Sequence, residues 1–317
     1  MKDAISQVYE GKECLIIIGL TGRTGAGCST VAKILEKKHF QDLDLRNAKH
    51  YDFKNSEERK ERIIDEYMKE PGRWQAFSVI EVSGLIFASV LESGIDSFCD
   101  YIKNITDETR KETINIGEKH KVLEGIKQMQ YMFDECKKYP LNPEQIEVSS
   151  LSAESISDYY KFYMETLKGY KKRFRSVMDS YSCYETYTDK LKGKQQSKFH
   201  LYTYIMQQFG NNIRCSGNPF KDQFNEKKYR LFAKRIAILI EIINSYNKNN
   251  NIQSTRICID AIRNPYEAMF LKDKYRAFYL MAVSTNDSDR CGRLRNLTSE
   301  ELANLDSIEY AQKMKYP

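Results

Sequence analysis

The sequence has few of the residues that break regular structure, and it has no long apolar run. Its 317 residues include only 15 glycines and 6 prolines, which excludes collagen-like and low-complexity chains. Its longest apolar runs, such as residues 15–18 and 237–240, are far shorter than the roughly 20 residues that span a bilayer. The first residues also lack the apolar stretch of a signal peptide. We therefore expect a globular protein without a membrane partner.

Closely spaced cysteine pairs are also missing. None of the 8 cysteines belongs to a C-x-x-C pair, which argues against a zinc ribbon, a redox motif and a dense disulfide framework. We expect a cytoplasmic protein with reduced thiols. The formal net charge of +6 is too small to require a nucleic-acid partner, although it suits ligands that carry phosphate.

Three short apolar runs predict the fold class. Residues 14–20 (CLIIIGL) form a β-branched run that glycines follow, and residues 29–40 then show apolar residues at helical spacing. Residues 256–260 and 278–284 are two further runs, separated by one helix-length segment. This order predicts an α/β fold of the P-loop NTPase, nucleotide-kinase-like type: a parallel sheet with helices on both faces.

The middle of the chain has a different pattern. Residues 92–228 contain no convincing strand and many helical stretches rich in Lys, Glu and Tyr. We expect a large helical insertion there, with the first part of the core in residues 1–91 and the second part, including an arginine lid, in residues 229–317. Density of turn-forming residues predicts loops near 139–143, 149–157 and 210–219.

The sharpest motif lies between the first predicted strand and its helix. It matches the phosphate-binding pattern G-x-x-x-x-G-K-[ST] at Gly22, Gly27 and Ser29, and its residues are Gly22, Arg23, Thr24, Gly25, Ala26, Gly27, Cys28, Ser29 and Thr30. Glycines allow backbone N–H groups to surround a phosphate, and the following helix N-terminus adds partial positive charge. We expect this loop to bind the phosphates of ATP or another nucleoside triphosphate, with the Ser29 hydroxyl as a ligand of Mg²⁺. A glycine-rich turn that binds nothing is the alternative.

One position departs from that pattern, because Cys28 stands where the lysine is expected. Backbone amides can still hold a phosphate, but a cation that balances charge during phosphoryl transfer is lost. Arg23 could replace that cation, or it could simply be solvated.

Polar residues follow the second and third predicted strands. Asp260 ends its strand, where the ligand crevice of α/β sheets lies, so it could hold Mg²⁺ or act as a base, with Arg263 as a further catalytic residue and Asn264 as a substrate contact. The alternative is an Asp that caps the next turn. Arg290 and Arg293 follow the third strand at helical spacing and could clamp a polyphosphate, or they could belong to an exposed charged helix.

A fourth motif lies in the middle of the chain. Residues 209–220 (FGNNIRCSGNPF) combine turn-forming residues with a single arginine, Arg214. This composition fits a loop in which Arg214 binds substrate, and it fits a structural connector nearly as well.

Five segments together resemble a known family. IGLTGRTGAGCST, RWQAFSVIEVSGLIF, FGNNIRCSGNPF, RICIDAIRNPYEAMFL and FYLMAVSTNDSDRCGRL are similar to the amino-terminal P-loop kinase-like domain of bacterial anti-phage cytidine nucleotide deaminases. They resemble nucleoside monophosphate kinases and dephospho-coenzyme A kinases more distantly. The resemblance implies that the loop holds nucleotide phosphates, that Asp260 and Arg263 face the site, and that Arg290 and Arg293 form a lid.

The deaminase half of that family is not found in this sequence. Neither H-x-E nor P-C-x-x-C occurs, so we expect no zinc and no deamination by this chain. The sequence predicts a nucleotide-kinase-type protein that binds Mg-NTP and phosphorylates a nucleotide, or alternatively a sensing module of an anti-phage defence protein.

The Lys- and Tyr-rich residues 168–204 fit a solvated helix face with Tyr packed beneath it, and they also fit an interaction surface. Tyrosine favours interfaces, so we expect a protein partner or a second copy of the chain there rather than nucleic acid.

Overall fold

The computed structural model describes residues 15–43, 55–104, 113–116, 119–180, 182–189, 193–294, 302–303 and 306, with side chains outside 105–119 and 181–200. The chain forms two compact units. Unit 1 comprises Met1–Glu81 and Asn250–Pro317, and unit 2 comprises Val82–Asn249. The expected boundaries at 91/92 and 228/229 therefore require correction. The helices that flank the insertion belong to unit 2, because their apolar residues are buried against other helices of that unit.

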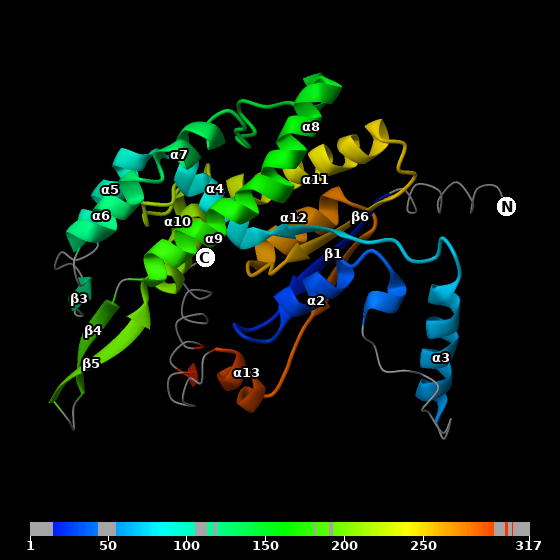
Figure 1. Cartoon of the computed structure of the whole chain (residues 1–317), viewed down its shortest axis with the longest axis horizontal. Helices are drawn as coiled ribbons and strands as arrows, with labels where there is room; N and C mark the ends of the chain where they lie inside the picture. The colour runs from blue at the N-terminus through cyan, green and yellow to red at the C-terminus, as the bar shows by residue number, and fades with distance from the viewer. Residues whose placement is uncertain are drawn as a thin grey trace. The chain divides into compact units, whose positions relative to one another are not determined.

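Unit 1 is built on a four-stranded parallel sheet with the order β2-β6-β1-β7 (Figure 1). Its strands are β1 (Leu15–Thr21), β2 (Ser78–Glu81), β6 (Thr255–Asp260) and β7 (Phe278–Ala282). Its helices are α2 (Cys28–Leu35), the 3₁₀ turn η1 (Phe40–Leu43), α3 (Ser56–Lys69), α12 (Pro265–Lys274) and α13 (Asp287–Arg293). The sheet confirms the predicted α/β class and adds β2 to the three predicted strands.

The core of unit 1 explains why its strands are apolar throughout. On one face of the sheet, Leu20, Val79 and Cys258 pack in a cluster with Cys28 and Ala32 of α2. Successive residues of a strand point to opposite faces, and the alternate residues Ile17, Ile80, Ile257 and Ile259 are also fully buried. A strand that is buried on both faces must be apolar at every position.

The connections in unit 1 place helices on both sides of the sheet. The chain crosses from β1 to β2 in one direction along the sheet and from β6 to β7 in the other. Because crossovers between parallel strands are right-handed, α2 and α12 lie on opposite faces. In contrast, α3 has no buried residue, and it stands away from the sheet in Figure 1.

Unit 2 is largely helical. Its helices are α4 (Val82–Glu92), α5 (Ile95–Asn104), α6 (Lys119–Lys127), α7 (Gln130–Cys136), η3 (Val148–Ser150), α8 (Ala153–Lys161), the π-helical turn η4 (Phe162–Thr166), α9 (Leu167–Asp179), α10 (Leu201–Ser216) and α11 (Leu231–Asn249). Helix α4 is buried almost all round, and Phe87 stacks on Phe174 with ring centroids 4.8 Å apart. Such packing holds the bundle together through apolar burial.

Unit 2 also contains strands, so the prediction of a purely helical insertion is wrong. The antiparallel strands β3 (Thr113–Ile116), β4 (Ser182–Asp189) and β5 (Gly193–His200) form a three-stranded sheet. The sequence of β4, SCYETYTD, is rich in Tyr and Thr, which suit a strand better than a helix. Its lysine-rich surroundings had favoured a solvated helix face. Residues 190–192, between β4 and β5, lie outside the described residues.

Within the described part of the chain, no single helix is long and apolar enough to cross a membrane. Helices α4 and α5 reach the length and composition of a span only as a pair, and they are bent by 101° relative to each other.

Candidate functional site

The segment from Gly22 to Thr30 forms a tight loop between β1 and α2. The backbone N–H of Ala26 donates to the carbonyl oxygen of Arg23 at 2.9 Å, which closes a turn. Gly25 and Gly27 have φ values of 81° and 111°, a left-handed region that favours glycine. Gly27 is the N-cap of α2 and supplies no side-chain cap. The N–H groups of Thr30 and Val31 donate to the carbonyl oxygen of Gly27 at 2.9 and 3.0 Å, and those of Cys28 and Ser29 precede these first bonds of the helix.

Side chains at the outer glycines would collide with their surroundings. A Cβ atom at Gly22 would lie 2.4 Å from the carbonyl oxygen of Val283, and one at Gly27 would lie 2.7 Å from a guanidinium nitrogen of Arg293. The chain thus uses glycine at the positions where the loop meets the segment that follows β7. Backbone atoms, rather than side chains, form the inner surface of the loop at these positions.

Cys28 belongs to the core beneath the loop. Its side chain is buried with Leu20, Ala32 and Val79. Burial raises the pKa of its thiol, and the nearby Asp260 carboxylate raises it further. The thiol is therefore protonated at neutral pH, so the position of the expected lysine carries no charge.

Two carboxylates end neighbouring strands beside the loop. Glu81 of β2 and Asp260 of β6 are partners in the parallel register, so their side chains belong to the same face of the sheet. Burial raises the pKa of the Cys258 thiol to about 12, with the Asp260 carboxylate as the next cause. Sequence reasoning found Asp260 and missed Glu81, although the acid directly after the run Phe77–Ile80 was the available signal.

The two residues that the sequence analysis expected to bind Mg²⁺ belong to different elements. Ser29 is exposed in the first turn of α2, whereas Asp260 ends β6. Among the described residues, no three His, Cys, Asp or Glu side chains gather closely enough to hold a metal ion by themselves.

The turn after β6 connects the sheet to the loop. The Arg263 guanidinium donates to the Thr24 hydroxyl at 2.8 Å. Ala261 has a φ of 73°, and the N–H of Ile262 donates to the carbonyl oxygen of Leu20 at 2.8 Å, so this turn follows β1 closely. The structure thus places the Arg263 side chain against the loop.

Asn264 has a structural role that the sequence analysis did not assign to it. Its side-chain oxygen accepts the N–H of Tyr266 at 2.9 Å and caps α12. The capping alternative had been considered for Asp260, whereas the N-cap of α12 is Asn264.

Arg290 is a buried anchor of α13 and not a free clamp, which corrects the prediction of a paired arginine clamp. Its side chain is 1% exposed, and its guanidinium bonds to the carboxylates of Asp306 and Asp287. Its Nε also donates to the carbonyl oxygen of Thr24 at 3.0 Å. The hydrogen bond to Asp306 is the main reason why the pKa of Arg290 is raised. These contacts fix α13 to the loop and leave its charge neutralised.

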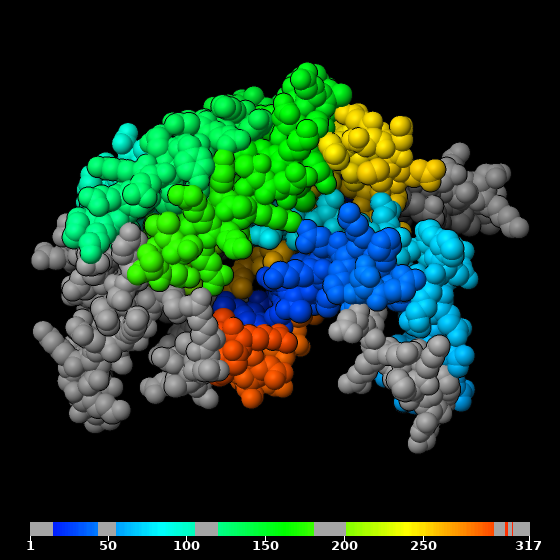
Figure 2. All heavy atoms as spheres, viewed as in Figure 1, coloured from blue at the N-terminus to red at the C-terminus, as the bar shows by residue number. Residues whose placement is uncertain are grey.

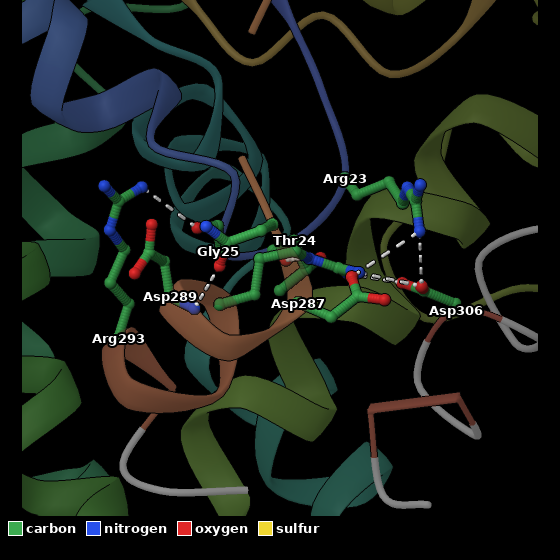
Figure 3. Close-up of polar contacts among 9 residues, drawn as sticks. Arg23, Thr24, Gly25, Asp287, Asp289, Arg293 and Asp306 are labelled. Carbon is green, nitrogen blue, oxygen red and sulfur yellow. Dashed lines mark hydrogen bonds and ion pairs between the residues drawn. The ribbon is translucent and has the colours of Figure 1, made fainter. Parts of the chain in front are cut away.

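The side chain of Arg293, from α13, and that of Arg23, from the loop itself, lie on opposite sides of Gly25 and Thr24 (Figure 3). Arg293 donates to the carbonyl oxygens of Ala26 at 3.0 Å and Gly25 at 3.4 Å. Among described carboxylates it has no ion-pair partner within 4.0 Å. Arg23 instead lies 3.3 Å from Asp306 and 3.9 Å from Asp287. In Figure 2 the atoms of α13, in orange, lie directly against the blue atoms of unit 1. Arg293 is thus the guanidinium beside Gly27.

Arg214 lies in unit 2, in the last turn of α10, so the prediction of a loop around it is wrong. Its guanidinium donates to the carbonyl oxygen of Gly210 at 3.2 Å and lies 5.2 Å from the ring centre of Phe232. The helix extends through this segment because Phe209 and Ile213, one turn apart, are both fully buried. The loop begins only at Gly217, whose φ is 76°.

No family model matches the chain, and no curated protein or solved structure matches it either.

Proposed function

We propose that the loop Gly22–Thr30 binds the phosphates of a nucleoside triphosphate, in a protein of the P-loop nucleotide-kinase type. The observation that carries the proposal is the loop itself. It joins a buried parallel strand to a helix N-terminus, and it contains two glycines with positive φ. This combination supplies backbone N–H donors and the partial positive charge of a helix, which both favour a phosphate. The resemblance of the sequence to P-loop kinase-like domains supports the same proposal.

Arg293 would supply the cation that is missing at the position of Cys28. Its guanidinium lies beside Gly27, where a Cβ would come within 2.7 Å of it. Arg23 and Arg290 pair with carboxylates, whereas Arg293 bonds only to carbonyl oxygens of the loop among described residues. A guanidinium released from those carbonyl groups can bind phosphate oxygens in a bidentate manner.

Magnesium would be held by oxygen atoms from three elements. Mg²⁺ is usually bound by one or two carboxylates together with phosphates of the substrate and water. Asp260 and Glu81 provide carboxylates on adjacent strands, and Ser29 provides an exposed hydroxyl. This donor set fits Mg²⁺ better than zinc, which prefers nitrogen and sulfur ligands. The ion would neutralise the outer phosphates.

Nucleotide titrations of Arg293→Ala test this arrangement. Hydrogen bonds between charged groups contribute about 1.5–3 kcal/mol, so we expect the variant to bind Mg-ATP at least about tenfold more weakly than the unmodified protein. The affinity for adenosine monophosphate should fall less, because Arg293 would contact the outer phosphates, which this ligand lacks. Isothermal titration calorimetry with both ligands measures the two losses.

The matched control is Arg276→Ala, which removes the same charge from an exposed position before β7. It should leave both affinities unchanged. Equal affinities in Arg293→Ala and Arg276→Ala would contradict the role of Arg293, and a failure of the unmodified protein to bind Mg-ATP would contradict the proposed function.

A second candidate function is nucleotide sensing without phosphoryl transfer, as a module of an anti-phage defence protein. The observation that favours it is the burial of the uncharged Cys28 in the core, because a phosphate-binding lysine normally stabilises the transferred group. If the protein is a kinase, it should transfer phosphate to a nucleotide acceptor, and Arg293→Ala should abolish that turnover. If it is a sensor, Mg-ATP should bind with negligible turnover, and Cys28→Lys should tighten binding. Coupled assays on a panel of ribo- and deoxynucleotide acceptors distinguish the two functions.

A further inference from the structure

Unit 2 contains a cavity of about 1180 Å³ that the nucleotide proposal does not use. Residues of α4 and α11 line it together with two segments, around residues 137–145 and 216–228. Small-molecule sites usually have volumes of about 300–1,000 Å³, so this cavity is large enough for a metabolite and much larger than a single ion requires.

A buried arginine forms part of the cavity wall. Arg235 of α11 is 6% exposed, and it donates to the Ser89 hydroxyl at 2.8 Å and to the carboxylate of Glu92. Glu92 also accepts the N–H of Leu141 at 3.4 Å. An ion pair with further hydrogen bonds can remain charged in a buried place, so this part of the wall is polar and fixed.

The loop after α10 is held in place by its own polar side chains. The buried Asn212 amide donates to the carbonyl oxygen of Pro219 at 2.9 Å, and the Ser216 hydroxyl donates to that of Lys221 at 2.7 Å. Phe220 also anchors the loop, because its ring stacks on that of Phe98 with the ring centres 6.1 Å apart. The wall that carries residues 217–225 is therefore preorganised, which lowers the entropy cost of binding.

The charge of the lining favours an anion. Four lysines and Arg235 line the cavity, against only Glu92 and Glu226. Glu92 pairs with Arg235, and Lys228 pairs with Glu144 at 2.8 Å. Lys221 and Lys227 form no ion pair among the described residues, and both are exposed. Two unpaired ammonium groups on one short loop are suited to a phosphate.

The other lining residues favour a ligand with a polar ring. Phe224 leaves 48% of its surface exposed at the cavity, where a flat ring could stack on it. Five side chains with amide groups, which can both donate and accept hydrogen bonds, also line the cavity: Asn142, Gln145, Asn218, Gln223 and Asn225.

We propose that this cavity binds a phosphorylated small molecule of mononucleotide size, with its phosphate on Lys221 and Lys227 and its ring on Phe224. The site lies wholly within unit 2 and does not depend on the loop Gly22–Thr30.

Titration calorimetry of the full chain tests the proposal, with adenosine monophosphate, ribose 5-phosphate and adenosine as probes in the absence of Mg²⁺. We expect adenosine monophosphate to bind most tightly and adenosine to bind most weakly. The double variant Lys221→Gln/Lys227→Gln should weaken both phosphorylated probes by about tenfold or more, since charged hydrogen bonds to phosphate are lost. Phe224→Ala should weaken adenosine monophosphate while ribose 5-phosphate keeps its affinity.

A matched double variant, Lys161→Gln/Lys172→Gln, removes the same charge from exposed positions of unit 2 that do not line the cavity. It should leave every affinity unchanged. Arg293→Ala separates this site from the loop of unit 1, because it should weaken the binding of Mg-ATP and leave the affinity for ribose 5-phosphate unchanged. The proposal is overturned if no probe binds, if both double variants behave alike, or if Arg293→Ala abolishes binding that Lys221→Gln/Lys227→Gln retains.

Discussion

At the scale of single residues, neighbouring carboxylates decide what each arginine can do. Arg290 and Arg293 are one helical turn apart in α13, yet only Arg290 lies within 4.0 Å of Asp287 and Asp306. Its buried charge is thereby satisfied, and it becomes an anchor. Arg293 is exposed and remains available for a ligand. The same type of residue therefore stabilises the loop at one position and would bind phosphate at the other.

The anchor predicts an acid-sensitive contribution to stability. The hydrogen bond from Arg290 holds the pKa of Asp306 below its usual value, and a second bond from Arg23 adds to this effect. A carboxylate with a lowered folded-state pKa stabilises the fold above its unfolded pKa of about 3.9, and that contribution is lost as the pH falls through the folded value. Asp306→Asn should thus reduce the free energy of unfolding at pH 7, and the difference from the unmodified protein should shrink as the pH falls below the unfolded pKa of about 3.9.

Urea unfolding followed by the fluorescence of Trp74 measures this difference, because this residue is the only tryptophan and belongs to unit 1. Its indole N–H donates to the carbonyl oxygen of Lys37, so its surroundings change on unfolding. Asp273→Asn, at an exposed position of α12, is the control. An Asp306→Asn variant as stable as the control at neutral pH would contradict the anchoring role.

At the scale of elements, the sequence predicted the strands and the loop, because local residue patterns determine them. The apolar runs of β1, β6 and β7 are visible because these strands are buried, and the glycine spacing of residues 22–27 reveals the loop. The end of α10 was missed because Gly210 and two asparagines resemble a turn. In the structure Gly210 instead leaves room for Ile86, because a Cβ atom at residue 210 would lie 3.1 Å from the Cδ1 atom of Ile86. The side-chain amide of Asn212 donates to the carbonyl oxygen of Pro219.

Contacts between distant parts of the chain account for the rest of the site. Arg290 was expected to bind a ligand, and its true partners include Thr24 and Asp306, which no local pattern connects to it. Glu81 gained its importance from its register with Asp260, which depends on the pairing of β2 with β6. Residue types and spacing predicted the loop, whereas the division of roles among its arginines required the tertiary structure.

At the scale of the whole molecule, the two proposed sites belong to different units. Unit 1 contains every residue of the proposed nucleotide site, and unit 2 contains every residue that lines the cavity. Each site can therefore be abolished by substitutions that leave the other unit intact. The central claim is that the loop Gly22–Thr30 binds nucleotide phosphates. Because the two sites lie in different units, a measurement that locates the bound nucleotide along the chain can test this claim.

Hydrogen exchange of the full chain with and without Mg-ATP tests that claim most directly, because it reads the backbone N–H groups that would contact the phosphates. Groups that bind phosphate exchange more slowly, since exchange requires the bond to open. We expect slower exchange in a peptide that covers residues 22–31, with little change in peptides from the buried strand β6, which are already protected. Binding of Mg-ATP without protection of residues 22–31 would contradict the account.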